Sequence, residues 1–195
     1  MISRQERERH LVDPRGTRFS FDSGSAALDF AYTGGPGRYA VFEVLHEPAD
    51  LVRWLAGSDL AVEVAAPDDD DFDHIRALRP AILQLTTAAA TDAPPPPDAV
   101  ATVNHWAAGP ALVPRYTGGT IRWVAPTAVG AAALLARETI GLVTRGDARL
   151  RQCAADDCPL LFHDVSRSGA RRWCSMQRCG NRHKVRQHRA RAGAG

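Results

Sequence analysis

Apolar residues recur at helical spacing in the middle of the chain. Between residues 72 and 85 they stand three or four positions apart, which places them on one helical face: Phe72, Ile75, Leu78, Ile82 and Leu85. The aspartates at 68–71 precede this face and suit the positive end of a helix dipole, an explanation that we prefer to a metal site. Pro80 interrupts the pattern, so the helix is expected to kink or restart there.

Other stretches predict further helices and a few strands. Helices are expected at residues 48–60, 99–108 and 127–144. Residues 112–116 and 120–124 flank the turn Thr117-Gly-Gly119 and predict a β-hairpin. Phe19 and Phe21 alternate with a serine and predict the start of a strand, whereas the apolar residues 26–33 are expected to be buried. The pattern indicates a mixed, helix-rich N-terminal domain.

Charge divides the chain into two parts. Residues 1–150 contain 14 basic and 19 acidic residues, a net charge of −5, whereas residues 151–195 contain 10 basic and three acidic residues, a net charge of +7. The hydrophobic share of 45% allows a packed core. No apolar run approaches the roughly 20 residues that span a bilayer. Residues 1–18 form a charged segment without the apolar stretch of a secretory signal, so we expect this segment to be loosely attached and the protein to be cytoplasmic.

Four cysteines, Cys153, Cys158, Cys174 and Cys179, lie in two pairs with four residues inside each pair. Thiolates at this spacing can reach the four corners of a zinc site, and a complete thiolate set leaves no open position for catalysis. The cysteine pattern therefore predicts one structural Zn²⁺ per chain. Two disulfides or an iron–sulfur cluster are the alternatives. The nearby His163, His183 and His188 are expected at the surface or in contact with a partner.

The zinc module is followed by a basic segment without proline, which is expected to form a helix. The cysteine region and this segment hold our candidates for nucleic-acid contact: Arg171, Arg172, Arg178, Asn181, Arg182, Lys184, Arg186, Gln187 and Arg189. Arginine and lysine bind phosphates, and the two amides suit adenine. Arginines beside the cysteines could instead stabilise thiolates, and the segment could be a solvated tail. Charge alone leaves RNA open beside DNA.

Two motifs carry a family resemblance. Arg171-Arg-Trp-Cys-Ser-Met176 and Cys179-Gly-Asn-Arg182 resemble the CGNR zinc finger over residues 149–192. Residues 27–33, followed by Leu51, Trp54 and Leu55, resemble the opening of the ABATE domain that precedes this finger in the family, although Tyr32 stands where the family usually has asparagine. The resemblance implies a bacterial transcription regulator, often described as stress-induced, whose zinc finger binds DNA.

These observations predict an α+β protein of three parts: the charged segment 1–18, an ABATE-like domain at 19–146, and a small four-cysteine zinc finger at 149–192 that ends in a basic helix. We expect the finger to contact DNA and the ABATE-like domain to sense a small-molecule effector or to form a homodimer. Asp29, Tyr32 and Thr33 are candidate ligand-binding residues, with core packing as the alternative. An RNA- or protein-interaction adaptor is the competing function. An enzyme is not expected, because the sequence lacks a nucleophile elbow, a phosphate loop and a zincin motif.

Overall fold

A computed structural model describes the whole chain except residues 1–8, 13–15, 59, 61, 126 and 193–195. Helices and helical turns are α1 (Ala26–Ala31), η2 (Gly37–Phe42), α2 (Pro48–Gly57), α3 (Asp69–Ala90), α4 (Pro97–Ala107), α5 (Ala128–Thr144), η3 (Met176–Gly180) and α6 (Asn181–Ala192). Strands are β1 (Arg9–Val12), β2 (Arg18–Phe21), β3 (Val113–Thr117), β4 (Thr120–Val124), β5 (Leu150–Gln152) and β6 (Leu161–His163). The predicted helix-rich α+β fold is confirmed.

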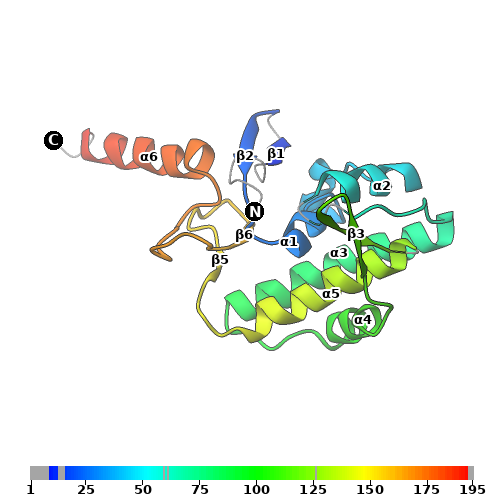
Figure 1. The fold of residues 1–195 in the computed structure, drawn as a ribbon. Coiled ribbons are helices and arrows are strands. Elements are labelled where there is room, and N and C mark those ends of the chain that lie inside the picture. The colour runs from blue at the N-terminus through cyan, green and yellow to red at the C-terminus, as the bar shows by residue number, and fades with distance from the viewer. Residues whose placement is uncertain (1–8, 13–15, 59, 61, 126, 193–195) are drawn as a thin grey trace.

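Three helices form the body of the protein. In Figure 1, α3 and α5 lie side by side, and α4 packs against both. The short helix α1 is buried against α3 and α5, and Glu138 of α5 caps its N-terminus by accepting hydrogen bonds from the backbone N–H groups of Ala26 and Ala27 at 3.2 and 3.0 Å. Among the described residues, no helix is long and apolar enough to cross a membrane.

The longest helix, α3, runs through Pro80 as one element. It begins as predicted, because the Asp68 side chain accepts a hydrogen bond from the Asp71 N–H. A proline at position 80 cannot bond to the carbonyl of Arg76, four residues earlier. The Arg79 Nε donates to that carbonyl at 3.2 Å instead. Of the two predicted outcomes, the restart at Pro80 is wrong, because α3 is one element and the Arg79 side chain satisfies the carbonyl that proline leaves unpaired. The kink stays a prediction.

Each sheet is an antiparallel hairpin of two strands. Between β3 and β4 the loop glycines Gly118 and Gly119 have φ values of 56° and 83°, the left-handed conformation that a two-residue hairpin turn requires. The predicted hairpin is confirmed. Strand β1 pairs with β2, so part of the N-terminal segment that we expected to be loosely attached is instead held in a sheet. The remainder of that segment lies largely outside the described residues.

The C-terminal part packs directly on the helical body. Its cysteines and the apolar residues of β6 belong to the same hydrophobic core as α1 and α3. The buried Tyr32 hydroxyl at the end of α1 accepts a hydrogen bond from the Leu161 N–H at 2.6 Å, and the His163 N–H donates to the Ser23 carbonyl at 2.7 Å. The core thus continues across the boundary predicted near residue 147. Helix α6 projects away from the body (Figure 1).

Candidate metal centre and nucleic-acid interface

The four cysteines reach one point from three local structures. Cys153 follows β5 and Cys158 lies in the turn before β6, where the Cys153 N–H donates to the Leu160 carbonyl at 2.9 Å and closes the hairpin. Cys174 lies in the loop after β6, and Cys179 lies in the helical turn η3. All four side chains are buried. The two cysteine pairs are therefore brought together by the fold.

The sulfur atoms fit a tetrahedral metal site. All four Sγ atoms lie within 4.8 Å of one another, with Cys174 Sγ at 3.6 Å from Cys158 Sγ and 3.5 Å from Cys179 Sγ. Zinc–sulfur bonds of 2.3 Å at tetrahedral corners place sulfurs about 3.8 Å apart. The donor set and its spacing are consistent with one bound zinc ion, and the cysteines are not paired as disulfides.

Crowding of the thiols separates their pKa values. Hydrogen bonds from the Cys158 and Cys174 thiols lower the pKa of Cys153 to about 7. The contact with Cys153 in turn raises the pKa of Cys158 and of Cys174. Hydrogen bonds from the other three thiols, Cys153 first, lower the pKa of Cys179. Four thiols this close together repel one another when ionised, and a central metal ion would displace their protons and stabilise four thiolates.

Two arginines lie against the sulfurs. Arg178 Nη1 lies 3.6 Å from Cys158 Sγ, and Arg182 Nη2 lies 3.3 Å from Cys179 Sγ. Arg182 also donates to both carboxylate oxygens of Asp157, at 2.8 and 3.0 Å. Four thiolates around Zn²⁺ carry a net charge of −2, which these guanidinium groups offset. Sequence analysis did not single out Asp157, although its position next to a cysteine was a usable signal.

Arg171 is partly buried and bonded to neighbouring backbone groups. Its guanidinium lies over the Phe162 ring, 4.2 Å from the centroid, and donates to three backbone carbonyls, those of Asp22, Trp173 and Cys174. Its backbone N–H donates to the buried Asp164 carboxylate at 2.8 Å. Arg171 thus ties the cysteine loop to the segment after β2, and its donors are used within the fold.

The three nearby histidines differ in environment. His163 is buried, with Nε2 3.7 Å from Asp147 Oδ2, so its expected surface position is wrong. His163 belongs to β6, whose three residues are all buried between the zinc module and the helical body. The His183 ring packs on Trp173 at a centroid distance of 4.7 Å and fixes α6 to the cysteine loop. His188 is exposed on α6.

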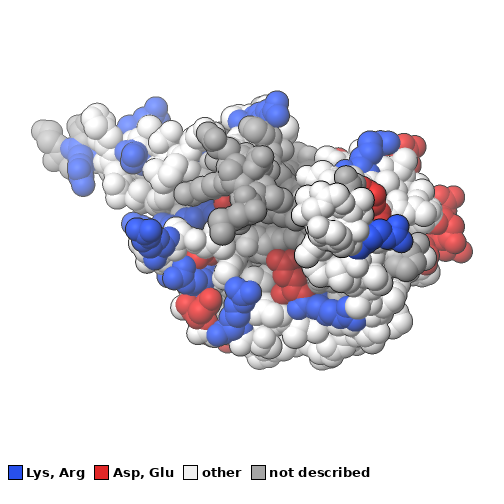
Figure 2. Space-filling model, in the orientation of Figure 1, with Lys and Arg blue, Asp and Glu red and all other residues white. Residues whose placement is uncertain are grey.

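The other candidates for nucleic-acid contact are exposed. They are Arg172, Asn181, Lys184, Arg186, Gln187 and Arg189. Arg186 lies 3.5 Å from Asp157 and keeps 58% of its side chain exposed. Helix α6 carries five cations and no acidic residue. Figure 2 shows basic side chains along α6 and on the surface beside it, whereas a group of acidic side chains lies at the far end of the body.

The candidate ligand-binding residues are part of the core. Asp29, Tyr32 and Thr33 are all buried, and Thr33 Oγ1 accepts a hydrogen bond from Arg79 Nη1 at 3.2 Å. None of the three lines the apolar cavity that lies beside α3. This placement favours the alternative of core packing. Tyr39, which does line that cavity, carried no signal in the sequence.

Comparison with known families covers nearly the whole described chain. The family model described as "Putative stress-induced transcription regulator", ABATE, matches residues 24–146. The model of the CGNR zinc finger matches residues 149–192. No curated protein matches the chain. Both resemblances predicted from the sequence are confirmed.

Proposed function

Because this chain belongs to the ABATE family of transcription regulators and ends in a CGNR zinc finger, we propose that it is a zinc-dependent DNA-binding regulator. Residues 149–192 act as the DNA-binding module, and the ABATE domain at 19–146 senses a ligand or mediates self-association. The exposed, uniformly basic helix α6 carries this proposal.

One structural zinc ion is held by Cys153, Cys158, Cys174 and Cys179. The closed set of four thiolates leaves the ion no open position, so it supplies folding free energy and no reactive group. Arg178 and Arg182 offset the excess negative charge from within contact distance of the sulfurs. The nucleic-acid role therefore falls to the arginines and lysine that do not contact a sulfur.

Helix α6 has the dimensions and charge of a DNA-reading helix. Its 12 residues give a length of about 18 Å, and a helix of this kind fits the B-DNA major groove, which is about 12 Å wide. The apolar residues of α6 are only Val185, Ala190 and Ala192, too few for a face that packs on a core. In this proposal the exposed Lys184 and Arg189 bind phosphates, and the exposed amides of Asn181 and Gln187 read bases.

A selection experiment tests the DNA-binding proposal. The zinc-loaded full chain is incubated with a randomised pool of DNA duplexes, and the bound duplexes are sequenced. An enriched motif is expected. Recovery of duplexes without a motif would favour the adaptor function, and the same experiment with an RNA pool would then identify an RNA partner.

A charge-matched pair of variants tests the contact surface. Lys184→Ala with Arg189→Ala removes two charges from α6, whereas Arg115→Ala with Arg145→Ala removes two exposed charges elsewhere. Each lost phosphate contact lowers by about 0.9 the magnitude of the slope of log K, the logarithm of the DNA-binding constant, against the logarithm of the salt concentration. We expect the first pair to lower this slope by roughly 1 to 2 and the second pair to leave it unchanged. Equal effects of both pairs would exclude α6 as the contact surface.

The β3–β4 hairpin supports self-association. Tyr116 lies opposite Ile121 and Pro114 lies opposite Trp123, so these four side chains share one face of the hairpin. The Tyr116, Ile121 and Trp123 side chains are 77%, 65% and 45% exposed. A monomer rarely exposes such a contiguous apolar face. A second copy of the chain is its proposed partner, because a dimer presents two α6 helices to paired half-sites.

Light scattering of the zinc-loaded chain tests this interface. The wild type is expected to be a dimer, and Tyr116→Lys with Ile121→Lys is expected to be a monomer. Thr117→Lys, on the opposite face of the hairpin, is the control and should remain a dimer. A wild type that is monomeric at micromolar concentration would contradict the interface.

A further inference from the structure

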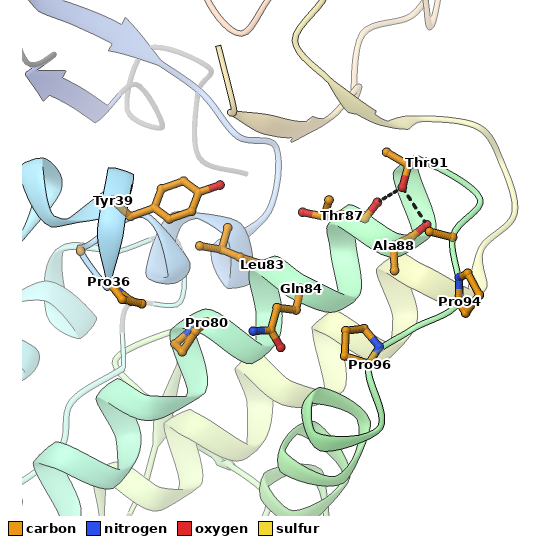
Figure 3. Close-up of a pocket in the computed structure, with 12 residues that line it drawn as sticks. Pro36, Tyr39, Pro80, Leu83, Gln84, Thr87, Ala88, Thr91, Pro94 and Pro96 are labelled. Atoms are coloured by element: carbon orange, nitrogen blue, oxygen red, sulfur yellow. Dashed lines mark hydrogen bonds between the residues drawn. The ribbon is translucent and has the colours of Figure 1, made fainter. Parts of the chain in front are cut away.

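An apolar cavity lies against the second half of α3 (Figure 3). Its volume is about 410 Å³, within the range of about 300–1,000 Å³ that small-molecule sites occupy. Its walls come from three separate segments of the chain: the η2 region, the α3 helix and the linker between α3 and α4. The residues that matter to the argument are Pro36, Tyr39, Pro80, Leu83, Thr87 and Pro96.

The cavity walls select an uncharged ligand. No charged side chain lines the cavity among the described residues, and the walls are dominated by proline rings, leucine, alanine and the Tyr39 ring. An ionised ligand that moves from water into this cavity would lose its hydration and find no opposite charge to compensate for that loss. Polar groups are few. The Thr91 hydroxyl already donates to the Thr87 carbonyl at 2.9 Å, whereas the exposed Gln84 amide offers a donor and an acceptor at the rim.

The wall residue Tyr39 connects the cavity to the zinc module through one other tyrosine. The ring centroids of Tyr39 and Tyr32 are 5.9 Å apart. Burial raises the pKa of Tyr32 well above its usual value of 10.0, so its hydroxyl keeps its proton. That hydroxyl accepts from the Leu161 N–H at 2.6 Å and donates to the Leu161 carbonyl at 3.4 Å. The preceding residue, Leu160, bonds to Cys153. A ligand that displaces the Tyr39 ring therefore acts on the segment between two of the four cysteines.

We propose that this cavity binds an uncharged, mostly apolar small molecule carrying one hydrogen-bonding group, and that its occupancy is transmitted to the zinc module through Tyr39 and Tyr32. The proposal rests on the sensing role proposed above for the ABATE domain. In this proposal the ligand binds beside α3. Tyr32 does not contact the ligand but positions the Leu161 backbone.

Binding of N-phenyl-1-naphthylamine to the zinc-loaded full chain tests the site. This neutral aromatic probe brightens in apolar surroundings, and we expect saturable binding of one probe per chain. Thr87→Trp fills the cavity from its rim and should weaken binding at least tenfold. His74→Trp adds the same side chain at an exposed position of α3 outside the cavity and should leave binding unchanged. If binding is not saturable, or if Thr87→Trp and His74→Trp bind the probe with equal affinity, the proposed site is wrong.

An anionic probe tests the ligand class. Anilinonaphthalene sulfonate has the same ring system with a sulfonate added, and we expect it to bind the site that Thr87→Trp blocks at least tenfold more weakly than the neutral probe. Equal affinity would overturn the assignment to an uncharged ligand. Probe affinity that falls as the protein concentration rises would show that a second copy covers the cavity, and this also would overturn the proposal.

Hydrogen–deuterium exchange tests the connection to the zinc module. The neutral probe should change exchange in residues 158–163 and leave the hairpin at 113–124 unchanged. In Tyr32→Phe the probe should still bind, and its effect on 158–163 should be lost. A wild-type chain that binds the probe without any change at 158–163 would refute transmission. Neither readout uses DNA, so a failure of the DNA-binding proposal and a failure of this site give different results.

Discussion

The ion pair between Glu43 and Arg79 offers a sharp test of the packing around the cavity. Arg79 lies on α3 with only 4% of its side chain exposed, and it donates to the two Glu43 carboxylate oxygens at 2.8 and 3.0 Å. Glu43 follows η2, so the pair holds this wall of the cavity against α3. Glu43→Gln keeps the shape of the side chain but leaves the buried guanidinium without a negative partner.

The cost of this substitution can be worked from the burial of the pair. Removing one partner of a buried ion pair costs about 3–5 kcal/mol, and the 21% exposure of Glu43 places the value near the lower end, about 3 kcal/mol. In a chain of this size about 1 kcal/mol shifts Tm by roughly 2–4 °C, so we expect a fall of roughly 10 °C. Thermal and guanidinium unfolding followed by circular dichroism would measure both quantities.

Two further variants control this experiment. Asp73→Asn removes an exposed partner of Arg76, 3.4 Å away with 76% of its side chain exposed, and should cost less than about 1 kcal/mol. Arg79→Met combined with Glu43→Gln removes both charges and should recover part of the lost stability. A Glu43→Gln protein as stable as Asp73→Asn would refute the reasoning that a buried, paired charge holds this wall.

Three other predictions concern pH, metal and helix capping. Burial would raise the pKa of Glu43, but hydrogen bonds from Arg79 and Leu45 outweigh it, so the folded-state pKa lies below the ordinary value of 4.5. The stabilisation by the Glu43 carboxylate is therefore fully present above pH 4.5 and is lost as pH falls through the folded-state pKa. The difference in unfolding free energy between the wild type and Glu43→Gln should narrow below pH 4.5. A difference that stays constant with pH would contradict this. Cys174→Ala should lose the zinc measured by plasma emission spectrometry and should unfold the cysteine module while α3–α5 stay helical; retention of one zinc per chain would contradict the ligand assignment. Glu138→Ala removes the carboxylate that accepts from the Ala26 and Ala27 N–H groups of α1 and leaves the Ser25 cap in place. It should cost about 1 kcal/mol in thermal unfolding, whereas unchanged stability would show that this carboxylate contributes nothing.

Local elements were predictable from the sequence because they depend on neighbouring residues. The three- and four-residue spacing from Phe72 to Leu85 marks a helical face, and the glycines at 118 and 119 permit the hairpin turn. The cysteine spacing and the run of cations after Gly180 are likewise local patterns. They were sufficient to predict the zinc module and the basic helix.

Residues of the same type in the same region of the sequence have different roles, and only the tertiary structure decides which role each one has. Arg171 and Arg189 carry the same charge in the same basic region, yet Arg171 donates to the carbonyl of the distant Asp22 and Arg189 is exposed on α6. The uninterrupted course of α3 through Pro80 likewise depends on where the Arg79 side chain points. Charge and residue type describe what a side chain can bond to, but its actual partner depends on which segments meet.

The cavity shows the same limit most clearly. For Asp29, Tyr32 and Thr33 the sequence left a ligand site and core packing open, and the packing of α1 against α3 and α5 buries all three. The space beside Tyr39 is formed by segments some 60 positions apart, from Pro36 to Pro96. The sequence by itself determined the elements, the metal-binding cysteines and the basic helix, since these follow from local spacing and composition. The apolar cavity beside Tyr39 and the contacts from it to the zinc module exist only once long-range packing has brought these elements together.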